Sequence, residues 1–148
     1  MPEKETVERA KEDAREGKSA STQAGEFVRE EIHHIRKGKH GARSAEQAIA
    51  IGLSKARRAG VRLETPKSTN STASTRHKAE LDSASAKHPH KPARKRSRAT
   101  EGALKRKGKA AVSKKALSRQ ARSASKMGGR KQRVSAAKKV VRTRKSRA

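Results

Sequence analysis

Large apolar side chains are so scarce in this chain that most of it lacks the means to build a hydrophobic core. Hydrophobic residues make up only 30% of the sequence, many of them are alanines, and Phe27 is the single aromatic residue. Fixing the backbone costs about 1–2 kcal/mol per residue, and a sequence this polar buries too little apolar surface to offset that cost throughout. We therefore expect one small folded unit followed by a long disordered or conditionally helical remainder.

The charge of the chain is divided unevenly between its two halves. Residues 1–65 carry 14 basic and 11 acidic side chains, a net charge of +3, whereas residues 66–148 carry 27 basic and 3 acidic ones, a net charge of +24. A strongly basic segment beside a nearly balanced one indicates a polyanionic partner, above all nucleic acid.

Several classes of protein are disfavoured by what the sequence lacks. The absence of cysteine excludes disulfides, thiolate zinc sites and cysteine nucleophiles. No apolar run approaches the length of a membrane span, and residues 1–5 do not resemble the start of a signal peptide. We expect a cytoplasmic protein with no membrane partner, in a compartment where DNA and RNA are the abundant polyanions.

The first two helices are predicted from apolar spacing and from glycine stops. The first spans about residues 5–15 and ends before Gly17. The second begins at Ser21 or Thr22, either of which can cap it, and ends before Gly38. Its apolar side chains recur on one face, which is typical of an amphipathic helix packed on a small core.

The third helix has the most complete local signature. Ser44 is the predicted N-cap, and Gln47 is placed to reach back to that cap as in a capping box. Gly60 is predicted to end the helix in the left-handed conformation, with Val61 closing the cap through an apolar contact. The fold class is therefore mainly α, with about three helices in a small N-terminal unit.

The chain is predicted to have three parts: a small helical domain over 1–63, a flexible linker over 64–92 and a basic tail over 93–148. The linker is rich in hydroxyl residues, and prolines interrupt any regular secondary structure in it. Three pieces of the tail can form helices, each beginning with a hydroxyl residue: 100–105, 113–125 and 135–141. None has enough apolar residues to be a stable helix alone.

The tail is the leading candidate for the functional site, because a flexible polycation neutralises phosphates and releases condensed counterions. Without aromatic side chains it has no platform for stacking bases, so we expect phosphate contacts, which position a protein on a nucleic acid but do not read its sequence. A merely solubilising tail and a membrane-surface segment are the less favoured alternatives. The predicted nucleic-acid-binding residues are Lys91, Arg94, Lys95, Arg96, Arg98, Lys105, Arg106, Lys107, Lys109, Lys114, Lys115, Arg119, Arg122, Arg130, Lys131, Arg133, Lys138, Lys139, Arg142, Arg144 and Lys145.

A second cationic group lies on and around the third predicted helix. Two helices joined by a short turn can make a helix-turn-helix, but the connection over 37–43 is longer than that turn. We favour a solvated face of a small bundle over a duplex contact for these residues. They are Arg43, Lys55, Arg57, Arg58 and Arg62.

The sequence predicts no metal site, no cofactor and no catalytic constellation. The histidines at 33–34, 40 and 88–90 are candidate ligands, but no carboxylate spacing completes a site around them. Residues 38–41, Gly-Lys-His-Gly, lack the spacing of a phosphate-binding loop. We therefore expect a protein that is not an enzyme.

Three segments carry a resemblance to other proteins. They read AGEFVREEI over 24–32, GKHGARS over 38–44 and QAIAIGLSKARRAG over 47–60. Together they resemble an uncharacterised family of small basic bacterial proteins, some of which are labelled plasmid stabilisation or DNA-binding proteins. The tail is similar in composition to bacterial histone-like domains rich in lysine and alanine. The resemblance implies a bacterial source and a nucleoid setting.

Together these patterns predict a non-catalytic, histone-like DNA-binding protein, with duplex DNA preferred over RNA. An RNA-associated or ribosome-associated factor and an interaction module of a plasmid-maintenance system remain as alternatives. The small apolar inventory also favours a homodimer formed through the N-terminal helices. The apolar residues expected to fold or dimerise this unit are Phe27, Val28, Ile32, Ile35, Ile49 and Leu53.

Overall fold

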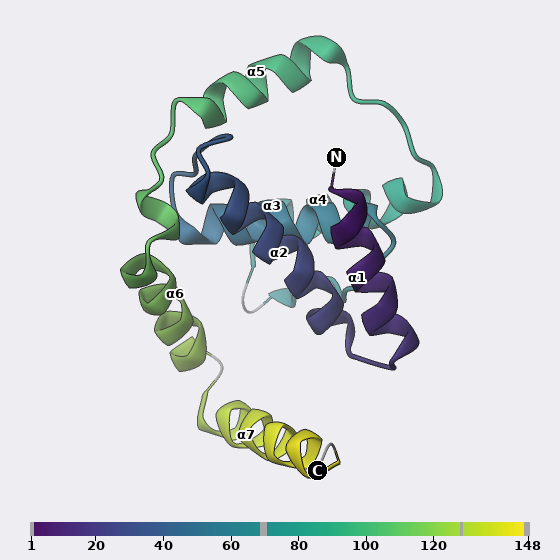
Figure 1. Ribbon diagram of the computed structural model, residues 1–148, viewed down its shortest axis with the longest axis vertical. Coiled ribbons are helices and arrows are strands. Elements are labelled where there is room, and N and C mark those ends of the chain that lie inside the picture. The colour runs from purple at the N-terminus through teal and green to yellow at the C-terminus, as the bar shows by residue number, and fades with distance from the viewer. Residues whose placement is uncertain (1, 69–70, 128, 147–148) are drawn as a thin grey trace. The chain divides into compact units, whose positions relative to one another are not determined.

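The structure is a computed structural model that describes residues 2–68, 71–127 and 129–146. Within these residues the chain forms seven α-helices and the 3-10 helix η2, and no strand (Figure 1). They belong to two compact units, residues 1–112 and residues 113–148. This division does not coincide with the predicted one, because the first unit extends through the predicted linker and into the predicted tail.

The three N-terminal helices are confirmed as α1 (Lys4–Arg15), α2 (Ala20–Arg36) and α3 (Ala45–Arg58). The N-cap of α2 is Ser19, whose hydroxyl accepts a hydrogen bond from the backbone N–H of Thr22. The prediction of Ser21 or Thr22 as the cap was therefore wrong. Ser19 alone stands before the first helical turn, where a side-chain oxygen meets the free N–H groups.

Both ends of α3 follow the predicted local chemistry closely. Ser44 Oγ accepts from the backbone N–H of Gln47 at 3.2 Å. Gln47 Oε1 reaches back as predicted, but it accepts from the N–H of Arg43, one residue before the cap, at 2.7 Å. Gly60 has a φ of +95°, and the N–H of Val61 donates to the carbonyl of Ala56. This left-handed cap is confirmed, and a residue with a β-carbon would be strained there.

Helix α2 packs against both α1 and α3 (Figure 1). Helices α2 and α3 come close at Gly52 of α3, where an added β-carbon would lie 2.6 Å from Val28 Cα of α2. One core cluster joins Ala10, Ala24, Phe27 and Ala56 from all three helices. Small residues thus let the helix backbones come close, which compensates for the scarcity of large side chains.

The long disordered tail was predicted wrongly, because the structure is helical through most of residues 73–146. The predicted linker contains α4 (Ala73–Lys87), which packs on α3. Ala79 is buried there, and Asp82 accepts hydrogen bonds from Ser54 at 2.6 Å and Arg58 at 2.7 Å. Helix α4 docks through one alanine and a carboxylate, so its sequence shows no apolar period.

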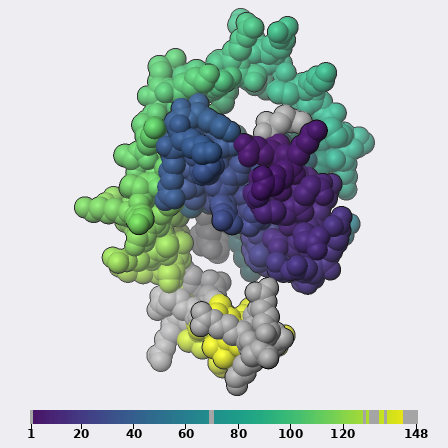
Figure 2. Space-filling model, viewed as in Figure 1, coloured from purple at the N-terminus to yellow at the C-terminus, as the bar shows by residue number. Residues whose placement is uncertain are grey.

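Residues 94–112, predicted to be part of the disordered or conditionally helical tail, contain α5 (Arg94–Lys105) and η2 (Ala110–Val112). The carbonyls of Leu104 and Gly108 accept hydrogen bonds from the backbone N–H groups of Gly41 and Ala42, at 3.0 and 3.2 Å. In Figure 2 the green residues of this segment lie against the blue connection between α2 and α3. The predicted tail therefore supplies part of the folded unit.

Val112 completes a second core cluster with Ile35, Ala42, Ala48 and Ala111. Val112 is only 1% exposed, and the guanidinium of Arg36 donates to its carbonyl at 3.2 and 3.3 Å. Phe27 and Ile35 are likewise buried within the chain, so neither needs a second copy to cover it. The homodimer stays a prediction.

The second unit contains α6 (Lys114–Met127) and α7 (Gly129–Ser146), which contact each other. Helix α6 begins after Ser113, whose hydroxyl accepts from the N–H of Ala116 at 3.2 Å. The pieces predicted to be helix-capable at 100–105 and 135–141 lie within α5 and α7, which are much longer than predicted, and the piece at 113–125 coincides with α6 and its cap Ser113.

Over residues 2–68, 71–127 and 129–146, no helix combines the length and the apolar character needed to cross a bilayer.

Candidate nucleic-acid interface

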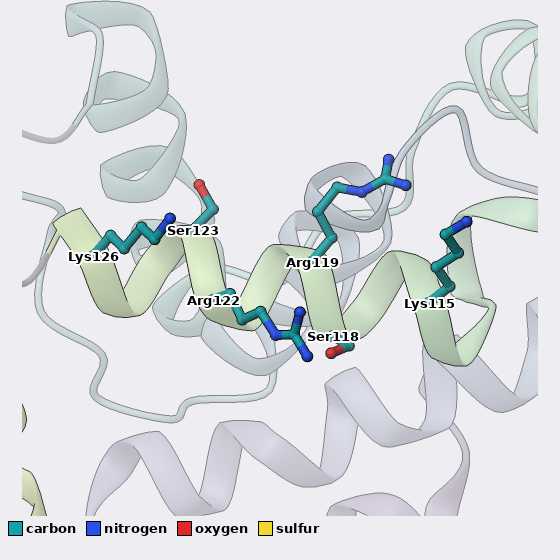
Figure 3. A pocket seen from close by; sticks show the side chains of 6 residues that line it. All are labelled: Lys115, Ser118, Arg119, Arg122, Ser123 and Lys126. Atoms are coloured by element: carbon teal, nitrogen blue, oxygen red, sulfur yellow. The ribbon is translucent and has the colours of Figure 1, made fainter.

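Helix α6 carries a row of four cations on one face, which we call the α6 basic face: Lys115, Arg119, Arg122 and Lys126. Steps of four, three and four residues return to the same side of a helix with 3.6 residues per turn. The row extends over about 16 Å at 1.5 Å per residue. Together with Ser118 and Ser123, the four cations line an open pocket along the helix (Figure 3).

The opposite side of α6 is less polar and less exposed. Ala116, Leu117 and Gln120 are half-buried, whereas all four cations of the basic face are exposed. The two serines flank the cations and offer hydroxyl groups beside them. Short hydroxyl side chains also donate hydrogen bonds to phosphate oxygens, so the face combines charge with further hydrogen-bond donors.

No carboxylate side chain balances the α6 basic face from within its own unit. The last acidic residue of the sequence is Glu101, and the 47 residues after it contain neither Asp nor Glu. Glu101 is itself engaged, because Lys105 Nζ lies 2.7 Å from its carboxylate. Lys105 holds the pKa of the Glu101 carboxyl below its ordinary value. No acidic side chain within residues 113–148 therefore offsets the positive charge along α6.

Helix α7 adds further predicted cations to the same unit. Lys138, Lys139 and Arg142 are exposed on it. The remaining predicted residues of this helix have side chains outside the described part of the structure: Arg130, Lys131, Arg133, Arg144 and Lys145.

The other predicted tail cations, apart from Lys114, belong to residues 1–112, so the structure does not gather the predicted site into one surface. Four exposed cations lie in the first turns of α5: Arg94, Lys95, Arg96 and Arg98. Lys91 precedes this helix and Lys114 begins α6, and both are exposed. Arg106, Lys107 and Lys109 lie in the docked connection to η2. A β-carbon added at Gly38 would lie 2.9 Å from Lys109 Nζ, which places this ammonium against the end of α2.

Three of the five cations around α3 are engaged inside the protein. Lys55 Nζ pairs with the carboxylates of Glu30 and Glu31. Burial lowers the pKa of Lys55, but the Glu31 and Glu30 carboxylates outweigh it and hold the pKa above its ordinary value.

Arg57, also of this group, is buried and donates to the carbonyl of Glu64, and Arg58 pairs with Asp82 at 2.7 Å. Arg43 and Arg62 are exposed. The α3 group is therefore mainly structural, and it does not form a continuous cationic face.

The sequence reasoning about histidines missed one arrangement. Glu31 lies beside His34 and His40, and ligand atoms of the three residues lie within 4.8 Å of one another. The prediction that no carboxylate stands with these histidines was therefore wrong, because Glu31 completes a group of three possible ligands with His34 and His40. The spacing of Glu31 and His34, three residues apart on α2, was the available signal, since such residues share a helix face.

No family model, no curated protein and no solved structure matches this chain. The resemblance to small basic bacterial proteins stays a prediction.

Proposed function

We propose that this protein is a non-catalytic nucleic-acid-binding protein, histone-like or nucleoid-associated, that holds duplex DNA through phosphate contacts made by the α6 basic face. The observation that supports the proposal is the row of four exposed cations on one helix, in a unit without a single acidic residue. A helix of this width fits the major groove of B-DNA, and a cationic row along it lies within reach of the phosphates that border the groove.

The chemistry of the face favours affinity without sequence reading. Lysine and arginine that neutralise phosphates release condensed counterions, and this gain is independent of base sequence. Sequence-tolerant binding of single strands relies instead on stacking of bases on aromatic rings. The one aromatic residue of this chain, Phe27, is 1% exposed in the core between α1, α2 and α3. Duplex DNA is therefore the favoured partner.

The proposal is tested by fluorescence anisotropy with a labelled duplex of arbitrary sequence and two matched variants. The first variant replaces the four cations of the α6 basic face with alanine, which keeps the helix because alanine has the highest helix propensity. The second replaces Arg94, Lys95, Arg96 and Arg98 of α5 with alanine. It removes the same charge from positions that are spread around most of the helix circumference.

We expect the α6 variant to lose on the order of 1000-fold in affinity at about 0.1 M salt, as four lost phosphate contacts imply. The α5 variant should lose much less. Equal losses in the two variants would show that the chain binds as an unstructured polycation. Unchanged binding by the α6 variant would show that the α6 basic face is not the binding site. If a structured RNA displaces the duplex at equal phosphate concentration, the partner is RNA and the proposal of DNA fails.

A further inference from the structure

Glu31 is a fully buried carboxylate whose two oxygens have different neighbours. Its exposed fraction is 0%. Lys55 Nζ pairs with Oε2 at 2.8 Å, whereas His40 Nε2 lies 3.2 Å from Oε1, which accepts no hydrogen bond from any described residue. A buried carboxylate oxygen without a hydrogen bond is costly in a protein interior, so Oε1 is the oxygen that a ligand would satisfy.

Two imidazoles converge on the same carboxylate. His34 lies one helical turn after Glu31 on α2, and its side chain is 10% exposed. His40 comes from the connection between α2 and α3, and its side chain is 16% exposed. One ring nitrogen of each histidine and one oxygen of Glu31 lie within 4.8 Å of one another. Two imidazoles and one carboxylate are the donor set of many three-ligand zinc sites.

The spacing of two of these donors already suits a small metal ion. With metal–ligand bonds of about 2.0–2.1 Å, a tetrahedral site separates neighbouring donors by about 3.3 Å. The distance from His40 Nε2 to Glu31 Oε1 is 3.2 Å. The ligand atoms of all three residues lie within 4.8 Å of one another, so His34 would have to move closer by about 1.5 Å at most to reach the tetrahedral spacing.

Partners outside the three donors hold both rings as metal sites require. His40 Nδ1 lies 3.2 Å from the carbonyl of Gly41, which leaves Nε2 facing Glu31. His34 Nε2 lies 2.8 Å from the carboxylate of Glu3, which is held in turn by Lys39 at 3.0 Å. A carboxylate or carbonyl on the second ring nitrogen orients metal-bound histidines and raises their basicity.

The charge of the cluster also favours a cation. The carboxylates of Glu3, Glu30 and Glu31 face two ammonium groups, those of Lys39 and Lys55. The carboxylates of this cluster therefore outnumber its ammonium groups by three to two. Lys55 approaches Oε2 of Glu31, whereas His40 approaches Oε1. A metal ion therefore has its own oxygen to bind.

We propose that Glu31, His34 and His40 form a binding site for one divalent transition-metal ion, Zn²⁺ being the best match to the donors. The three residues leave a fourth position of a tetrahedral ion for water. The ion would link α2 to the connection that contains Gly41, whose backbone N–H is bonded to the carbonyl of Leu104. Metal binding would thus reinforce the contact between the N-terminal helices and the segment of 104–112.

The test uses full-length protein in which the exposed His88 and His90 are both replaced by glutamine, so that they do not bind metal themselves. Zn²⁺ is titrated by calorimetry, and Co²⁺ is added separately to read the visible bands of a four-coordinate ion. His40→Gln and Glu31→Gln remove donors. His33→Gln is the matched control, because His33 is an exposed neighbour of His34 outside the cluster. Helix circular dichroism checks that each variant is folded.

The expected result is one Zn²⁺ per chain in the background protein and in His33→Gln. Each donor variant should lose at least about 100-fold in affinity, since partners outside the donor set alone cost 10–100-fold. Zn²⁺ should also slow amide exchange over residues 38–42 in the background protein. Absence of stoichiometric Zn²⁺ binding, or equal affinity of His33→Gln and His40→Gln, would overturn the proposal. A donor variant that is misfolded is replaced by Glu3→Gln, which should weaken binding about tenfold and must do so for the proposal to stand.

Discussion

Replacing Val112 with alanine tests whether the predicted tail is part of the folded unit. Val112 is 1% exposed and packs with Ile35, Ala42, Ala48 and Ala111. The substitution removes two methyl groups, worth about 0.8 kcal/mol each in lost burial, and leaves a small cavity that adds to the cost. We expect the free energy of unfolding to fall by about 2 kcal/mol, a large share of the stability of a small domain.

The assay is urea unfolding of the full-length chain followed by helix circular dichroism. Val140→Ala is the matched control, because it removes the same two methyl groups from a side chain in α7 where Val140 is 52% exposed. Its effect should stay within about 0.5 kcal/mol. If Val112→Ala costs no more than Val140→Ala, residues 104–112 are not docked on the N-terminal helices, and the corrected fold is wrong.

Three further predictions concern the local structure of the first unit. Gly41→Ala would place a β-carbon 1.9 Å from the carbonyl oxygen of Lys107, so we expect a loss of about 1–3 kcal/mol and faster amide exchange over 104–112. Ser19→Ala removes the hydroxyl that caps α2 and should cost about 1 kcal/mol in urea unfolding. The pKa of the Glu46 carboxyl is lowered by its own backbone N–H and by the Ser44 hydroxyl. Because a lowered pKa stabilises the fold above the ordinary value of 4.5 and that contribution is lost as the pH falls, Glu46→Gln should flatten the decline in stability below that pH.

The N-terminal helices were predictable because their signals are local. Ser44 with Gln47, the glycine at 60 and the apolar stripe of α2 all act within a few residues. Ser19 shows the limit of such reasoning, since three neighbouring hydroxyl residues can each cap a helix and only the final backbone geometry selects one of them. Local chemistry predicts that a helix exists more reliably than it predicts the first residue.

The docking of residues 73–112 was not predictable from apolar periodicity, because it depends on few apolar atoms. Helix α4 is held by Ala79 and by Asp82, and the segment near η2 is held by backbone hydrogen bonds to Gly41 and Ala42. Backbone groups are the same in every residue, so the sequence does not show which of them will pair. Long-range contacts through alanine and glycine leave no pattern in composition.

The candidate site was also predictable only in part. The helix that carries the α6 basic face was predicted from Ser113 and its neighbours, and once it is helical the spacing of its cations fixes their common face. The internal roles of Lys55 and Arg57 depend on Glu30, Glu31 and the carbonyl of Glu64. Pairing with residues from other parts of the chain decides which cations remain at the surface.

The salt dependence of duplex binding tests the central claim most directly. The logarithm of affinity against the logarithm of salt concentration should be steeper for the wild-type chain than for the α6 four-alanine variant by about 3.6, which is about 0.9 for each of four phosphate contacts. The α5 four-alanine variant should keep nearly the wild-type slope. Equal slopes for the wild-type chain and the α6 variant would contradict the claim that the α6 basic face binds the phosphates.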